Sequence, residues 1–292
     1  MSVVIVGAGS YTGFNLVKKI SKDRETLAVI SNKNTNTIPR EFYNENNIKT
    51  LSSIESLLSE KLSQKSIIIY LGGYSSSDHT FTDIEKLTRA YITGVSQSLE
   101  VARKFGCPIV IVGSYWELLS KIGNNSNINL YSAIQASQNK ILEFFAYEYG
   151  ISITKIFQAD TYGPNDWRPK LLSAVINSIK NNKVLNVGSP NQIIAPIYIS
   201  DVIGDLIDIM DSASFGENLL NQVQLMPDKV YTLKKFIDKI EIVTQKTVLV
   251  NWNTKANIRA DIENFPIIKN IHKNKNKRVI LEEGLNEVLR II

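Results

Sequence analysis

The start of the chain places the strongest limit on its fold. A continuous apolar run from Val3 to Val6 leads directly into Gly7-Ala8-Gly9-Ser10-Tyr11-Thr12-Gly13, and helical spacing follows from Phe14 to Ile20. A strand, a glycine turn and a helix in this order present backbone N–H groups and a helix N-terminus to one point, where a dinucleotide pyrophosphate can bind. The spacing is one residue longer than the usual G-x-G-x-x-G, so a purely structural turn is the alternative. We expect the cofactor to contact Gly7, Gly9, Ser10, Tyr11 and Gly13.

The rest of the chain alternates between expected strands and expected helices. Apolar runs at 28–30, 66–71, 108–112 and 151–157 predict buried strands, and spacing of three or four residues predicts helices at 82–105 and 130–149. Ile84 is among the core positions that we expect on the first of these helices. Regular alternation favours an α/β fold, a Rossmann-type doubly wound parallel sheet with helices on both faces.

The pattern becomes less regular after Tyr162-Gly163-Pro164, which indicates a smaller substrate-binding region. A short apolar run at 197–199 predicts a strand that returns to the sheet, with a helix at 202–210 behind it. We therefore expect a dinucleotide-binding domain at 1–160, to which 189–215 returns, and a substrate-binding region at 161–188 and 216–292.

Composition and charge narrow the class of protein. Hydrophobic residues make up 43% of the 292 residues and charged residues 21%, as in an ordinary globular enzyme. No apolar run approaches the roughly 18 to 20 residues that span a bilayer, and the run at Val3 is too short for a signal peptide, so we expect a cytoplasmic protein. Because Cys107 has no second cysteine, we expect neither a disulfide nor a metal site, and a packing role at the head of a strand.

The net charge of +5 suits anionic ligands. One basic run, from His272 to Arg278, could bind nucleic acid, but a short solvated loop is the commoner meaning of such a run. We expect no nucleic-acid or membrane partner.

The residues after the second expected strand bear on the choice of dinucleotide. About 20 residues beyond the glycine turn, NAD sites usually place an acid on the ribose hydroxyls. Here Ser31, Asn32 and Lys33 follow Ile30, and none of them is acidic. These three residues are candidate contacts of a 2′-phosphate, which favours NADP(H) over NAD(H), unless they are plain loop residues.

Two polar residues, Ser114 and Tyr131, follow the glycine turn along the chain in a recognisable pattern. Ser114 follows the expected strand 108–112, and Tyr131 lies on the expected helix 130–149. Together with the glycine turn they resemble the extended short-chain dehydrogenase/reductase family, whose members act mostly on nucleotide sugars. Several segments are similar to the branch of CDP-abequose and CDP-paratose synthases, which reduce the 4-keto group of a nucleotide-linked deoxyhexulose for surface polysaccharides: Asn129–Ala133, Asp160–Asp166, Arg168–Leu171, Ile197–Val202 and Leu281–Leu285.

The resemblance implies a role for each of these residues. A ketone that accepts hydride develops negative charge on oxygen, so Tyr131 would donate a proton and Ser114 a hydrogen bond. The implied neighbours of the cofactor are Leu71, Gly72 and Gly73, and the implied substrate contacts are Tyr74, Trp116, Asp160, Arg168 and Lys170, the last two at the diphosphate. Helices 84–103 and 130–149 resemble the family's dimer surface, so a homodimer is expected.

The chain also departs from the family pattern. The family has Lys four residues after Tyr, where its charge lowers the tyrosine pKa, and this chain has Gln135 at that catalytic position. Lys140, nine residues from Tyr131, points to the opposite face of a helix and cannot replace it. Tyr91 stands where Asn is common, Ser10 replaces the middle glycine of the turn, and Leu71-Gly72-Gly73 replaces the usual Leu-Ala.

Three functions are compatible with these departures. The first is a nucleotide-sugar 4-ketoreductase that uses NADPH. The second is a nucleotide-sugar epimerase or ring isomerase (mutase) without net redox, and the third is a non-catalytic binding subunit. The fold alone does not choose among them.

Overall fold

The computed structural model describes residues 2–30, 47–75, 79–119, 129–212, 219–253, 265–272 and 277–290. The candidate 2′-phosphate contacts Ser31, Asn32 and Lys33 lie outside these residues. The chain forms two compact units: unit 1 comprises Met1–Leu118, Asn129–Phe157 and Leu206–Val223, and unit 2 comprises Leu119–Ile128, Gln158–Asp205 and Gln224–Ile292. The segment from Leu206 to Val223 thus packs in unit 1, whereas the sequence placed 189–215 there.

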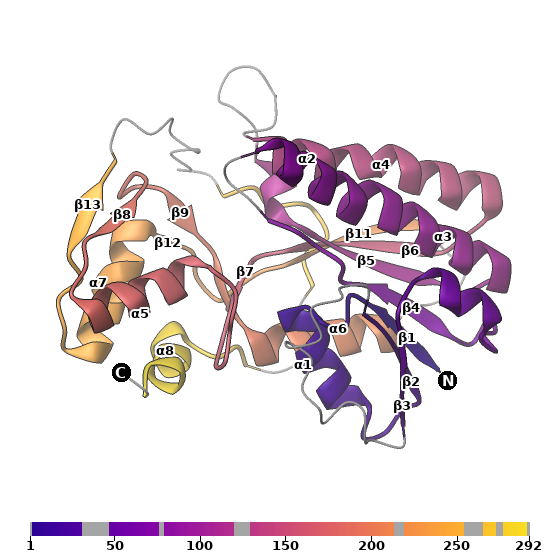
Figure 1. Cartoon of the computed structure of the whole chain (residues 1–292), viewed down its shortest axis with the longest axis horizontal. Helices are drawn as coiled ribbons and strands as arrows, with labels where there is room; N and C mark the ends of the chain where they lie inside the picture. The colour runs from indigo at the N-terminus through magenta and orange to yellow at the C-terminus, as the bar shows by residue number, and fades with distance from the viewer. Residues whose placement is uncertain are drawn as a thin grey trace. The chain divides into compact units, whose positions relative to one another are not determined.

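Unit 1 is built on a seven-stranded sheet, which confirms the predicted Rossmann-type fold (Figure 1). The strands lie in the order β11-β6-β5-β4-β1-β2-β3, and each pair from β3 to β5 is parallel. β1, β2 and β4 are buried at every residue because helices cover both faces. Since β1 lies between β4 and β2, the chain changes direction across the sheet there, and such switch points place ligands at the carboxyl ends of the strands. The strand bounds are β1 Val3–Val6, β2 Thr26–Val29, β3 Ile48–Leu51, β4 Ile67–Tyr70, β5 Ile109–Ser114, β6 Ile153–Gln158 and β11 Leu220–Leu225.

The helices of unit 1 lie on both sides of this sheet. Figure 1 shows α2, α3 and α4 on one side and α1 with the C-terminal part of α6 on the other. Their bounds are α1 Tyr11–Ile20, α2 Phe81–Thr88, α3 Gly94–Phe105, α4 Leu130–Tyr149 and α6 Ile199–Ser212, and two short 3-10 helices are η3 Glu55–Ser59 and η5 Tyr115–Leu118. Among the described residues, no helix is both long and apolar enough to span a bilayer.

The predicted helix 82–105 is continuous, but its middle is not α-helical. A π-helical turn, η4 (Arg89–Thr93), joins α2 to α3. Such turns insert a residue and are frequent at functional sites, and here the turn contains Tyr91. Ile84 was wrongly predicted in the core, since it is 41% exposed. The buried face of α2 runs through Asp83 and Leu87, so Ile84 lies at the edge of that face.

The core of unit 1 fills the space between the sheet and α3 and α4. Val95 and Leu99 on α3 and Leu142 on α4 are fully buried against β4 and β5, and burying each such side chain contributes about 2 kcal/mol. Cys107 packs in this core before β5, as predicted, and its thiol donates to the Ser63 carbonyl at 3.1 Å. Burial raises the pKa of Cys107 to about 11, so the thiol stays protonated and unreactive.

Unit 2 contains three two-stranded sheets. Its helices are α5 Leu171–Asn181, α7 Leu233–Thr244 and α8 Leu281–Leu289, and its strands pair as β7 Asp160–Tyr162 with β10 Pro196–Tyr198, β9 Ile193–Ile194 with β12 Tyr231–Thr232, and β8 Leu185–Val187 with β13 Val250–Trp252. The strand expected at 197–199 is therefore β10, but it does not return to the central sheet. A three-residue apolar run cannot specify its partner, and β11 takes the sheet position beside β6 instead.

The basic run from His272 to Arg278 is not a solvated loop at its two described ends. Arg278 forms an ion pair with the buried Asp205 at 2.7 Å, and His272 lies 3.5 Å from the same carboxylate. The sequence suggested a loop because basic residues are mostly exposed, but a buried carboxylate needs cationic partners.

Candidate active site

The glycine turn is held by its own hydrogen bonds. Ser10 is the N-cap of α1, and its Oγ accepts from the Gly13 N–H at 3.0 Å. The N–H groups of Gly7 and Ala8 both donate to the Val29 carbonyl at 3.1 Å, which ties the turn to the end of β2. Helix α1 begins at Tyr11, so the end of the turn is already helical, earlier than the predicted start at Phe14.

Two of the three glycines are required by the backbone, and the third leaves space. Gly7 has φ +86°, and a Cβ there would lie 2.5 Å from the Gly72 N atom. A Cβ on Gly13 would lie 2.9 Å from the Ala8 Cα. At Gly9, in contrast, a Cβ would meet only the Ile30 Cγ2 at 3.3 Å, and its N–H makes no hydrogen bond within the part of the chain that the structure describes. A free backbone N–H at a helix N-terminus fits a dinucleotide pyrophosphate.

The close approach at Gly7 leads to a first prediction. We expect Gly7→Ala to lower the free energy of unfolding by about 2–4 kcal/mol, because a side chain at positive φ is strained and also strikes the backbone of the neighbouring loop. Gly150→Ala is the matched control, since Gly150 has φ +66° but nothing within 4 Å of an added Cβ. Urea unfolding of both variants measures the difference. Equal losses would show that the contact with Gly72 contributes nothing.

The loop after β4 is fixed by two tyrosines. The Leu71 N–H donates to the Val6 carbonyl at 2.7 Å. The Tyr91 hydroxyl donates to the Tyr74 carbonyl at 2.9 Å and accepts from the Tyr74 N–H at 3.2 Å. A Cβ on Gly73 would lie 3.1 Å from that hydroxyl, and one on Gly72 would lie 2.7 Å from the Tyr70 hydroxyl, so both glycines give room to a phenol. The π turn thus brings Tyr91, at the position where the family often has Asn, to this loop.

The structure brings Ser114, Tyr131 and Gln135 together. Ser114 ends β5, and Tyr131 lies in the first turn of α4, whose N-cap Asn129 forms a capping box with Ser132. Gln135 follows Tyr131 by one helical turn, so both side chains lie on one face.

The surroundings of the Tyr131 hydroxyl favour its protonated form. Burial raises the pKa of Tyr131, hydrogen-bonding contacts with Ser114, Tyr91 and Gln135 oppose that rise, and the carboxylate of Glu117 adds to it. The Tyr91 ring packs edge-on against the Tyr131 ring at 5.7 Å between centroids. Burial also raises the pKa of Tyr91 well above its usual value.

Two buried charged residues lie beside this group, and sequence reasoning missed both. The Lys155 Nζ on β6 donates to Glu117 Oε2 on η5 at 2.6 Å, and the two side chains are 0% and 1% exposed. The same ammonium donates to the Asn139 Oδ1 at 2.9 Å and to the Gln135 carbonyl at 3.3 Å. A lysine within a strand expected to be buried was the signal in the sequence, because a charge there must have a buried partner.

Burial opposes the charge on each member of this pair. It raises the pKa of Glu117 to about 7, although Lys155 and the Ser114 N–H act to lower it. It lowers the pKa of Lys155, and Glu117 acts in the opposite direction. Lys140, in contrast, is 86% exposed and pairs with Glu143 at 2.6 Å, as its place on the far face of the helix predicted.

The expected substrate contacts belong to both units and are described within each. In unit 1, the Trp116 N–H donates to the Ser114 Oγ at 3.3 Å, and the Tyr74 hydroxyl donates to Asp83 at 2.5 Å. In unit 2, Asp160 accepts from the Ala195 N–H at 3.0 Å.

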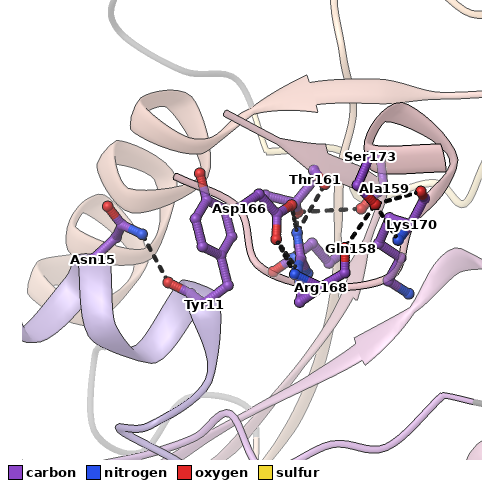
Figure 2. A network of polar contacts seen from close by, with 9 residues as sticks. All are labelled: Tyr11, Asn15, Gln158, Ala159, Thr161, Asp166, Arg168, Lys170 and Ser173. Atoms are coloured by element: carbon purple, nitrogen blue, oxygen red, sulfur yellow. Dashed lines mark hydrogen bonds and ion pairs between the residues drawn. The ribbon is translucent and has the colours of Figure 1, made fainter. Parts of the chain in front are cut away.

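Arg168 is the centre of the polar network in unit 2. Figure 2 shows its guanidinium facing Asp166, to which Nε and Nη2 donate at 2.8 and 2.7 Å. Nη2 also donates to the Thr161 carbonyl at 2.9 Å. The exposed Lys170 is the N-cap of α5, where its N–H donates to the Ser173 hydroxyl at 2.9 Å. The guanidinium is thus oriented by its neighbours.

Known proteins resemble this chain in sequence and in fold. CDP-abequose synthase from Yersinia pseudotuberculosis is 24% identical over 218 residues, which cover 73% of this chain and 74% of that protein. UDP-glucuronic acid 4-epimerase from Bacillus cereus, in complex with UDP-glucuronic acid and NAD, superposes with a TM-score of 0.80 at 14% identity, covering 99% of this chain and 98% of that one. For dTDP-glucose 4,6-dehydratase from Bacillus anthracis in complex with NAD, the TM-score is 0.78 at 14% identity, with 99% and 96% covered. These two solved structures share the fold.

The family model described as NAD dependent epimerase/dehydratase family matches residues 3–218. This match runs from β1 through the glycine turn, Ser114 and Tyr131 to the end of α6, and covers well over half of the chain. The chain therefore belongs to the NAD dependent epimerase/dehydratase family, the extended short-chain dehydrogenases/reductases.

Proposed function

We propose that this protein is a nucleotide-sugar 4-ketoreductase, which uses NADPH to reduce a CDP- or dTDP-linked 4-keto-deoxyhexose in surface-polysaccharide sugar biosynthesis in the cytoplasm. The observation that carries the proposal is the Tyr131 hydroxyl beside Ser114 and Gln135, whose pKa is raised by burial and by the Glu117 carboxylate so that it stays protonated. Its catalytic residues are Tyr131, Ser114 and Gln135.

The proton chemistry follows from these residues. The reduced dinucleotide supplies a hydride when it is bound. As the ketone becomes an alkoxide, the Tyr131 hydroxyl transfers its proton to that oxygen, and the Ser114 hydroxyl stabilises the developing charge by a hydrogen bond. Gln135 lies one helical turn after Tyr131, with its side chain on the same face of α4. Water then restores the proton to the tyrosinate.

The direction of the reaction follows from the protonation state. An epimerase or a dehydratase that begins by oxidising a hydroxyl needs a tyrosinate to remove the proton of that hydroxyl, and a cation nearby stabilises the tyrosinate. Among the described residues, the charge that acts on Tyr131 is the carboxylate of Glu117, which raises the tyrosine pKa. A phenol with a raised pKa is a weaker acid, but it stays protonated at neutral pH and so can donate to the strongly basic alkoxide, whereas the tyrosinate that oxidation needs is scarce, which supports reduction over oxidation.

The class of substrate rests on the relatives. The name of CDP-abequose synthase gives a CDP-linked sugar as its product. The solved structure of the Bacillus cereus epimerase contains UDP-glucuronic acid. We infer that Arg168 and Lys170 bind the diphosphate and that Tyr74, Trp116 and Asp160 contact the sugar. Arg168 would then divide its guanidinium N–H groups between the phosphate oxygens and Asp166.

We further infer a homodimer that forms through α2, α3 and α4. Large aromatic side chains are exposed on two of these helices: Phe81, Phe144, Tyr147 and Tyr149. Aromatic side chains are enriched at interfaces, because they bury much area at a low entropic cost.

The preference for NADPH is a second prediction. We expect the protein to bind NADPH more tightly than NADH, because no acid follows Ile30 and Lys33 can pair with a 2′-phosphate. Lys33→Glu should reverse the preference, and Lys22→Glu, with the same charge change at an exposed position, should not. Titration calorimetry with both dinucleotides measures this. Equal affinities in the unmodified protein would remove the inference.

The reaction itself is tested with purified protein, NADPH and a CDP- or dTDP-4-keto-6-deoxyhexose. We expect steady loss of nicotinamide absorbance together with formation of the 4-hydroxy sugar. Sugar conversion without net loss of NADPH would instead indicate an epimerase or ring isomerase. Binding of both compounds with neither change would indicate a non-catalytic subunit.

A further inference from the structure

The buried pair of Glu117 and Lys155 joins the elements that carry the proposed catalytic residues. Lys155 reaches from β6 to the backbone of α4 at Gln135 and to Asn139 one turn later. The Ser114 N–H acts on Glu117, on η5, to lower the pKa of its carboxyl. One ion pair thus contacts the backbone at Gln135 and lies beside the backbone of Ser114.

Side chains from the same elements also meet at Gly113. A Cβ on this glycine would lie 2.7 Å from the Glu117 Oε1 and 3.1 Å from the Gln135 Oε1. The two side chains therefore close over the backbone just before Ser114. The ion pair, the Gln135 amide and the end of β5 form one packed group in unit 1.

A buried ion pair of this kind needs a reason. Removing two charges from water costs more than their attraction commonly returns, and well-packed apolar residues often do as well. A pair retained at 0% and 1% exposure next to Tyr131 is therefore a candidate for a role in the site itself.

We propose that Glu117 and Lys155 are a positioning pair for the active site: Lys155 supplies from β6 the ammonium that α4 lacks at Gln135, and Glu117 balances its charge while holding the Ser114 backbone. The inference rests on the proposed function in so far as Tyr131 is the acid. In this arrangement the cation supports the catalytic residues without stabilising a tyrosinate.

The charge balance of the pair beside Tyr131 makes the proposal specific. The titratable or charged groups that face Tyr131 are Tyr91 from η4, Glu117 from η5 and, behind Glu117, Lys155 from β6. Tyr74 and Asp83 lie behind Tyr91. Removing one charge of the pair leaves the other uncompensated, so the two single variants should move the tyrosine pKa in opposite directions.

The test is a titration of Tyr131 itself. Tyrosinate absorbance is followed against pH for each variant and for the same variant carrying Tyr131→Phe, and the difference reports Tyr131 without any turnover. Glu117→Gln keeps the shape and removes the carboxylate that raises the Tyr131 pKa, so the Tyr131 midpoint should fall by about one pH unit. Lys155→Met leaves Glu117 uncompensated, so the midpoint should rise. In the double variant the charges balance again, and the midpoint should return close to that of the unmodified protein.

Other readouts separate positioning from mere stability. The double variant should melt above either single variant, bind NADPH as the unmodified protein does, and lose about tenfold in kcat, because Ser114 and Gln135 are no longer held. Lys140→Met, which removes an exposed cation from the same helix, should change none of these values. Lower melting temperatures with no shift of the Tyr131 midpoint, or with shifts of the same sign, would overturn the proposal.

If the single variants do not fold, the double variant still tests the proposal, since an unchanged kcat in that variant would contradict a positioning role. Failure of the proposed function is a different result. It would be an unmodified protein that oxidises no NADPH, and the titration would remain interpretable.

Discussion

Tyr131→Phe is expected to lower turnover about 100-fold or more, because it removes the hydroxyl that we propose as the proton donor to the substrate oxygen. The fold should survive, since the ring keeps its edge-on contact with Tyr91 and only the hydroxyl is lost. Steady-state kcat of the purified variant measures the effect, and a thermal melt checks the fold.

Tyr147→Phe is the matched control for this prediction. Tyr147 lies on the same helix and is 68% exposed, so the loss of its hydroxyl should leave turnover unchanged. If Tyr131→Phe turned over at the unmodified rate, the proton donor would have to be another group. Tyr91, whose ring packs against Tyr131, would then be the next residue to replace.

Gln135→Lys is expected to destabilise the protein rather than to repair it. Gln135 is 1% exposed, and Lys155 already donates to its carbonyl and occupies the carboxylate of Glu117. A second ammonium would therefore share one carboxylate in a buried site, at a cost of about 3 kcal/mol of unfolding free energy. Urea unfolding measures that loss.

The new cation should also change Tyr131 itself. A positive charge one helical turn away stabilises the tyrosinate, so the alkaline limb of the pH–rate profile should move to lower pH. Gln135→Met, which has a similar volume and no charge, should not move that limb to lower pH. A Gln135→Lys variant that keeps its melting temperature and oxidises NADPH faster would mean that Lys155 does not fill the role of a cation at this site.

Much of the fold was predictable because its signals are local. The strand, glycine turn and helix of residues 3–20 are adjacent in the sequence, so the backbone conformation there follows from neighbouring residues. The spacing from Tyr131 to Gln135 is one turn of a helix whose cap, Asn129, is also local. The alternation of elements then determined the parallel sheet.

Other features depended on contacts that no local pattern contains. The apolar run at 197–199 was readable as a strand, but its pairing with β7 rather than with the central sheet was decided by competition with β11. Similarly, the periodicity of residues 82–105 did not show the π turn that brings Tyr91 to the loop after β4.

The sequence by itself determined the dinucleotide-binding fold and the neighbourhood of Ser114, Tyr131 and Gln135. Only the tertiary structure decided which charged residues lie beside these three. Lys155 and Glu117 are separated by 38 positions and meet at 2.6 Å because β5 and β6 are adjacent strands. Burial of a charge is tolerated only with a partner, and that partner is selected by the packing of the sheet rather than by any spacing along the chain.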